Sequence, residues 1–124
     1  MKRAKIIYWI TTGIIAFMMT YSAYAYLTDS ALEQGFQHLG YPSYFRIELA
    51  IAKLIGVVLL LAPLARSVKE WTYAGFAITF VSAFIAHTAS GDPVSARIAP
   101  IAFLVVLGVS YYMYRKIHPA VQAA

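Results

Sequence analysis

The sequence predicts an all-α membrane protein: a bundle of four transmembrane helices with one short amphipathic helix at the membrane interface between the first and second. Two observations lead to this fold class. Apolar residues make up 61% of the 124 residues and charged residues 12%, whereas soluble domains contain about 45–50% and about 25%. In addition, four apolar runs approach the ~20 residues that a bilayer crossing needs. Because the chain is short, we expect one membrane domain over residues 1–124.

The expected spans are residues 6–27, 44–64, 71–89 and 98–114. The first ends near Ala23-Tyr24-Ala25, which has the form of a signal-peptidase site. Its apolar run is longer than the ~7–15 residues of a signal core, so we expect a retained span. Pro63 ends the second span, and the turn residues 90–93 end the third. Pro100 is expected in or near the first turn of the fourth, where a missing N–H costs little.

A short amphipathic helix is expected in the connection between the first two spans. Residues 30–33, Ser-Ala-Leu-Glu, have the S-x-x-E pattern of a helix capping box. Leu32, Phe36 and Leu39 follow at helical spacing on one face. Such a helix lies on the membrane surface with its apolar face toward the lipid or the bundle.

The basic residues predict the orientation of the chain. With four spans, one side carries seven Lys and Arg residues: Lys2, Arg3, Lys5, Arg66, Lys69, Arg115 and Lys116. The other side has only Arg97 outside the expected spans. The positive-inside rule therefore places both termini in the cytoplasm of a cell with an inner (plasma) membrane. The basic residues follow the membrane ends, so the net charge of +5 indicates topology and lipid contact, with no nucleic-acid partner.

The second span carries three charged residues, Arg46, Glu48 and Lys53. Charge at membrane depth is costly and by default marks a functional site. At about 1.5 Å per residue, Lys53 lies near the middle of the ~30 Å hydrocarbon layer. Glu48 and His87 fall at similar depth toward the outer side. One hypothesis is a polar pocket of Glu48, Lys53 and His87 that binds a ligand or handles protons. The other is that neighbouring hydroxyls and carbonyls satisfy Lys53 and that Glu48 pairs at the interface.

Tyr24, Asp92 and His38 are secondary polar candidates, because they fall on the same side of the membrane as Glu48 and His87. Arg46 is expected to be an interface anchor. A haem would need His38, outside the spans, as a second axial ligand beside His87, so haem is not indicated. The chain has no cysteine, which excludes thiol redox chemistry and thiolate metal sites. No metal-ligand spacing and no catalytic motif is present.

Four segments resemble the DoxX-like family of small four-helix membrane proteins: GFQHLGYPSYF at 35–45, AKLIG at 52–56, KEWTYAGF at 69–76 and HTASGDP at 87–93. They occur in the expected order and cover nearly the whole chain. The resemblance implies a four-helix bundle. It also implies a link to the wider DoxX group, which includes membrane subunits of quinone-dependent thiosulfate oxidation and of other redox or stress-related complexes. The matching positions, Lys53, Gly56, His87, Gly91 and Asp92, form no catalytic motif, so no catalytic role is carried over.

Three functional hypotheses follow. The first is a small accessory or quinone-interacting subunit of a membrane redox system, with Lys53, Glu48 and His87 as its polar pocket, a quinone as its cofactor and redox-complex subunits as its partners. The second is a proton-coupled transporter module, working as a homo-oligomer, in which Glu48 or Lys53 titrates. The third is an assembly partner without a ligand of its own, held to its partner by small-residue faces such as that of Ala52 and Gly56.

Overall fold

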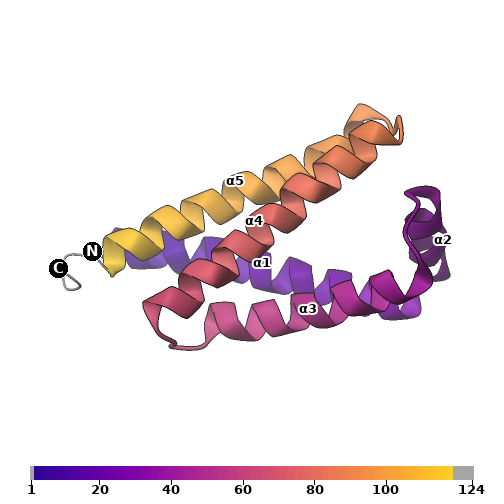
Figure 1. The fold of residues 1–124 in the computed structure, drawn as a ribbon. Helices are drawn as coiled ribbons and strands as arrows, with labels where there is room; N and C mark the ends of the chain where they lie inside the picture. Colours follow the sequence, from indigo (N-terminus) through magenta and orange to yellow (C-terminus); the bar gives the residue numbers. More distant parts are fainter. Residues whose placement is uncertain (1, 119–124) are drawn as a thin grey trace.

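The computed structural model describes residues 2–118. Within this range the chain forms five helices: α1 (Lys2–Thr28), α2 (Ser30–His38), α3 (Ser43–Leu61), α4 (Arg66–Ala89) and α5 (Val94–Ile117). The four long helices run side by side in alternating directions, and α2 stands across one end of them (Figure 1). The predicted all-α bundle, with a short helix between its first two long helices, is confirmed. Residue 1 and residues 119–124 of the predicted domain lie outside the described residues.

The bundle is packed unevenly. α1 packs closely against both α3 and α5, and α4 packs along α5, whereas α3 and α4 contact each other over a smaller region. Figure 1 shows α4 diverging from α3 as it runs from their connection toward the end where α2 lies. The core consists of buried apolar side chains from the four long helices: Tyr8, Ile15, Met19, Val57, Leu60, Tyr73, Phe76, Phe80, Leu107 and Tyr114. The side between α3 and α4 is therefore the loosest side of the bundle.

The outward faces of the long helices are apolar. Phe17 is 70% exposed and Ile78 is 66% exposed, as expected of side chains that face lipid rather than water. By length and composition α1, α4 and α5 can each cross a membrane, so the chain is a multi-pass helical membrane protein. α3 has 19 residues and lies along α1, but it carries three charged residues. Its role as a fourth span stays a prediction.

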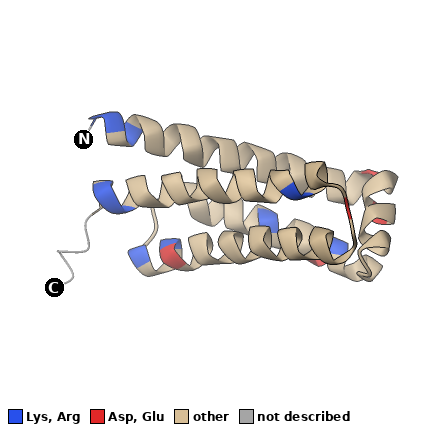
Figure 2. Cartoon of the chain, turned by 90° about the horizontal axis from the view of Figure 1, so that it is seen from above, with Lys and Arg blue, Asp and Glu red and all other residues tan. Residues whose placement is uncertain are grey.

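The charges separate along the bundle. Most Lys and Arg residues lie at the end that holds both termini and the α3–α4 connection, with a few farther along the bundle, whereas most Asp and Glu residues lie toward the end with α2 (Figure 2). We call these the basic end and the α2 end. At the α2 end, Asp29 caps α2 and Glu33 lies in its first turn. The side of the membrane that each end faces stays a prediction.

Two prolines bear on how the helices differ from the expected spans. α3 ends at Leu61 rather than at residue 64, because Pro63 disfavours the helical conformation of the residue before it. Ala62 accordingly has φ −73° and ψ 148°. α5 begins at Val94, so Pro100 lies in the second turn rather than at the start of the helix. The helix tolerates it there, and its ring is buried.

Helix α2 begins one residue earlier than its capping pattern predicted. The N-cap is Asp29 rather than Ser30, and its carboxylate accepts a hydrogen bond from the Ala31 amide at 2.9 Å. Phe36 is the buried residue of α2, in contact with the rings of Tyr26, Tyr41 and Phe45. Gly40 follows the helix with a φ of 88°, a conformation that glycine adopts at little cost. The aromatic contacts hold α2 against the ends of α1 and α3.

Candidate functional site

Lys53 is a buried cation in the middle of α3. Its side chain is only 6% exposed. The ammonium donates a hydrogen bond to Ser22 Oγ at 2.8 Å, and Nζ lies 3.9 Å from the centroid of the Tyr26 ring. Ser22 and Tyr26 are four residues apart on α1 and therefore share a face. Among residues 2–118 no carboxylate forms an ion pair with Lys53. The ammonium has three donors, and the described contacts use one.

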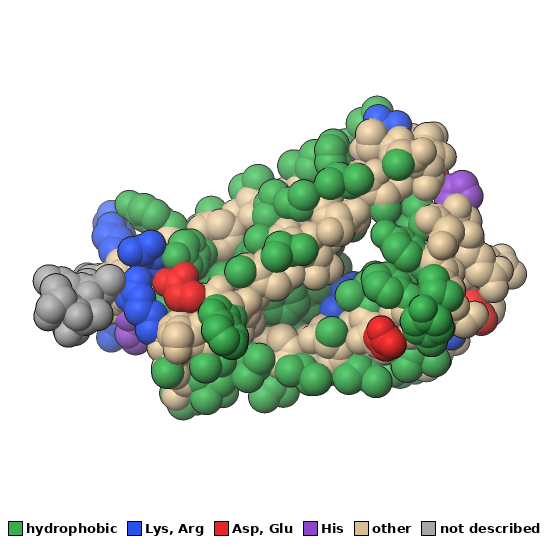
Figure 3. Space-filling model, in the orientation of Figure 1, with side chains coloured by type: hydrophobic (Ala, Val, Ile, Leu, Met, Phe, Trp, Pro, Cys, Tyr) green, Lys and Arg blue, Asp and Glu red, His purple; other side chains and the backbone are tan. Residues whose placement is uncertain are grey.

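A cavity of about 270 Å³ lies between α3 and α4, beside Lys53. Its lining residues are Leu49, Ala52, Lys53, Ile55, Gly56, Leu59, Thr72, Gly75, Phe76 and Thr79. The space-filling view shows a hollow between these two helices, with a Lys or Arg side chain at its depth (Figure 3). Both lining threonines donate to carbonyls of their own helix, each at 2.8 Å. Lys53 is thus the lining group that still has N–H donors to offer to a ligand.

Gly56 leaves room for the ring of Phe76 on α4. A Cβ atom at this position would lie 2.7 Å from Cζ of Phe76, which is closer than van der Waals contact allows. Phe76 has little freedom to move, because its ring is buried and stacked on Phe80 with 6.2 Å between centroids. The small residues Ala52 and Gly56 line the cavity, and at Gly56 the missing side chain accommodates the Phe76 ring of α4.

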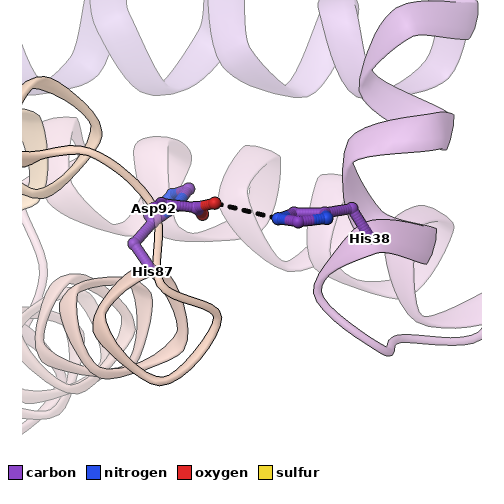
Figure 4. Close-up of polar contacts among 3 residues, drawn as sticks. All are labelled: His38, His87 and Asp92. Atoms are coloured by element: carbon purple, nitrogen blue, oxygen red, sulfur yellow. Dashed lines mark hydrogen bonds and ion pairs between the residues drawn. The ribbon is translucent and has the colours of Figure 1, made fainter.

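A second polar cluster lies at the α2 end, where Asp92 accepts hydrogen bonds from two histidines (Figure 4). His38 Nε2 lies 2.8 Å from Oδ1 of Asp92, and His87 Nδ1 lies 2.6 Å from Oδ2. The turn that ends α4 places His87 and Asp92 close together. The Asp92 amide bonds the His87 carbonyl at 3.0 Å and the Gly91 amide bonds the Thr88 carbonyl at 3.1 Å. This is the Schellman pattern, which brings residues five apart into contact.

Gly91 has the positive φ of 72° that this pattern needs. We call His38, Asp92 and His87 the His–Asp–His triad. Hydrogen bonds from His87 and then from His38 hold the pKa of the Asp92 carboxyl below its ordinary range, so it is a carboxylate at neutral pH. Within residues 2–118 no group of three His, Asp or Glu residues has the arrangement of a metal site.

The structure separates the three residues that the sequence suggested for one pocket. Lys53 lines the cavity, but Glu48 and His87 do not. Glu48 is exposed because it lies about 140° around α3 from Lys53, and His87 pairs with Asp92 instead. The single pocket of Glu48, Lys53 and His87 does not form. Tyr24 is 66% exposed and so points away from the site as well.

Several polar partners were missed by sequence reasoning. Ser22 and Tyr26, the partners of Lys53, carried only the weak signal of an i, i+4 pair on α1. Arg46, expected as an anchor at the membrane surface, donates to the carbonyl of Tyr26 near the end of α1. A cation there also complements the helix dipole. The surroundings of Lys53 are thus held by α1 and α3 together.

A buried hydroxyl network in the core was also missed. Ser110 Oγ on α5 lies 2.7 Å from Thr12 Oγ1 on α1 and 2.7 Å from the Tyr73 hydroxyl on α4. Thr12 and Ser110 are fully buried. Hydrogen bonds between helices are a usual source of cohesion in membrane bundles. We assign this network to stability, because it lines no part of the cavity.

A family model described as the DoxX-like family matches residues 10–110. The chain belongs to the DoxX-like family. The matched range includes all of α2, α3 and α4, and with them the cavity and the His–Asp–His triad of this DoxX-like protein. No curated protein and no solved structure matches the chain.

Proposed function

We propose that this DoxX-like protein is a membrane-embedded binding subunit for a lipid-soluble quinone and that it serves a membrane redox system. The observation that carries the proposal is that Lys53 lines a cavity between α3 and α4. Its buried ammonium donates one described hydrogen bond, to Ser22, so two of its three N–H donors have no described acceptor. In keeping with the positive-inside rule, we place the protein in the inner membrane with its basic end in the cytoplasm.

The chemistry of the cavity suits a quinone head. Its walls are largely apolar, with the ring of Phe76 among them, and binding sites of this kind use a few polar groups to orient an otherwise apolar ligand. The ammonium of Lys53 can donate to a quinone carbonyl oxygen. Hydrogen bonds from a charged donor are stronger still to an oxygen that carries negative charge. Lys53 therefore favours a ligand whose reduction places charge on that oxygen.

The position of the cavity suits a ligand that arrives from the membrane. It lies on the loosest side of the bundle, where α4 diverges from α3 (Figure 1). An isoprenoid tail could remain in the lipid between the two helices while the head lies beside Lys53. Glu48 is exposed on another face of α3, so it offers no support for a proton-coupled transport site at this cavity.

The test is photolabelling with an azido-quinone in proteoliposomes, followed by peptide mapping. We expect label on residues 49–59 of α3 and 72–79 of α4. Gly56→Leu should abolish this label, because its side chain would fill the cavity and meet Phe76. Gly13→Leu is the matched control, since a side chain at Gly13 meets nothing within 4 Å.

Lys53→Met is the second variant in this test. It removes a hydrogen bond from a charged donor, worth about 1.5–3 kcal/mol, so we expect quinone binding to weaken by about tenfold to a hundredfold. Helix content, measured by circular dichroism, shows whether each variant is folded. If Gly56→Leu does not fold, Lys53→Met decides alone. Label spread evenly over the lipid-facing surfaces, or equal affinity in wild type and Lys53→Met, would rule out the quinone site.

A further inference from the structure

We infer that α2 is a lid at the α2 end of the Lys53 cavity, and that the His–Asp–His triad is the latch that holds this lid to the α4–α5 hairpin. The identity of the ligand that enters the cavity rests on the proposed function. The attachment of the lid is independent of that proposal, because it depends only on contacts within this chain.

The attachments of α2 are unequal. α2 contacts α3 and α1, whereas its contact with α4 and α5 is slight. The hydrogen bond from His38 to Asp92, at 2.8 Å, joins α2 to the α4–α5 turn. No other side-chain hydrogen bond in the described part of the chain links α2 to α4 or α5. The triad therefore spans the open side of the bundle, between the α1–α3 half and the α4–α5 half (Figure 4).

A line of contacts connects the lid with the candidate site. The ring of Phe36 on α2 meets the ring of Tyr26 edge to face, with 4.9 Å between centroids. The ammonium of Lys53 lies over the same Tyr26 ring, with Nζ 3.9 Å from the ring centroid. Phe36 is the buried residue of α2, so a movement of the helix displaces it. A change in the position of α2 consequently reaches Lys53 through one aromatic ring.

The latch is weak enough to open. The His38 side chain is 58% exposed and that of Asp92 is 14% exposed, and a single partly exposed pair of this kind contributes little to stability. α2 is also bounded by short connections: the N-cap Asp29 precedes it and Gly40, with its positive φ, follows it. Lids of enzymes move about loop or terminal positions of this kind. Opening the latch would leave the hollow between α3 and α4 (Figure 3) wider at its α2 end.

The test is a distance measurement between spin labels in nanodiscs, without added quinone. The chain has no cysteine, so introduced cysteines are the only labelling sites. Gln34→Cys on α2 with Ile85→Cys on α4 reports the distance across the latch at the α2 end, since both side chains are exposed. Leu61→Cys with Trp71→Cys reports the basic end as an internal control.

Asp92→Ala and His38→Ala should each shift the distance at the α2 end to longer values and broaden it. The basic-end pair should not change. His87→Ala should have the smaller effect, because it leaves the bond between His38 and Asp92 in place. Glu33→Ala is the matched control for loss of a charged side chain, because Glu33 lies on α2 outside the triad.

If Asp92→Ala and His38→Ala both reproduce the wild-type distances, the triad does not hold the lid and the inference is overturned. The quinone proposal is judged separately by photolabelling of the wild-type protein. If photolabelling fails but the distance shift is observed, the quinone proposal is wrong and the lid inference stands. If photolabelling succeeds without a distance shift, the lid inference is wrong and the quinone proposal stands.

Discussion

Replacement of Lys53 by methionine tests whether this residue serves a ligand or the fold. The change removes a hydrogen bond from a charged donor, worth about 1.5–3 kcal/mol, and a cation–π contact worth about 0.5–2 kcal/mol. It also removes the desolvation penalty of a buried ammonium, which is several kcal/mol. Methionine has a similar length and fills irregular space well. The gain and the loss therefore nearly cancel.

We expect the free energy of unfolding of Lys53→Met to equal that of the wild type or to exceed it by about 1–4 kcal/mol, the range found when buried charges give way to apolar residues. Ser22→Ala should act in the opposite direction. It leaves the ammonium buried without its partner at 2.8 Å, which costs about 1–3 kcal/mol. Unfolding in mixed micelles, followed by circular dichroism, measures both variants under the same conditions.

A loss of more than about 3 kcal/mol in Lys53→Met would refute this reasoning, because such a loss is typical of a buried charge with an essential structural partner. Lys53 would then be retained for the fold, and its position at the cavity would carry no functional meaning. Unchanged or raised stability together with weaker quinone binding would instead show that Lys53 is kept at the expense of stability.

Two further predictions concern other parts of the bundle. Ser110→Ala leaves the hydroxyls of Thr12 and Tyr73 without their shared buried partner, so we expect a loss of about 1–3 kcal/mol in the free energy of unfolding, while an exposed control such as Ser95→Ala should change it little. The pKa of Asp92 is lowered in the folded protein, so the contribution of its two hydrogen bonds is present above the ordinary aspartate value of about 3.9 and is lost as the pH falls through the lowered folded value. The difference in thermal midpoint between wild type and Asp92→Asn should accordingly narrow below about pH 4, and a difference that stays constant under acid conditions would contradict it.

Much of the fold could be predicted because it depends on local chemistry. Long apolar runs determine which segments are helical in a membrane, and a glycine with positive φ ends both α2 and α4. The turn at residues 90–93 was recognisable for the same reason. The errors at helix ends were also local: Asp29 competed with Ser30 as the cap, and Pro63 acted on the residue before it.

The candidate site was only partly predictable. Depth along a helix follows from residue number, so the sequence by itself predicted that Lys53 is a cation far from the membrane surface and needs a partner on another segment. Tertiary structure alone decided that this partner is Ser22, that His87 turns to Asp92 and that Glu48 faces outward. The physical reason is that the rotation of each helix about its axis, and the divergence of α4 from α3, are set by packing between helices, which no single segment contains.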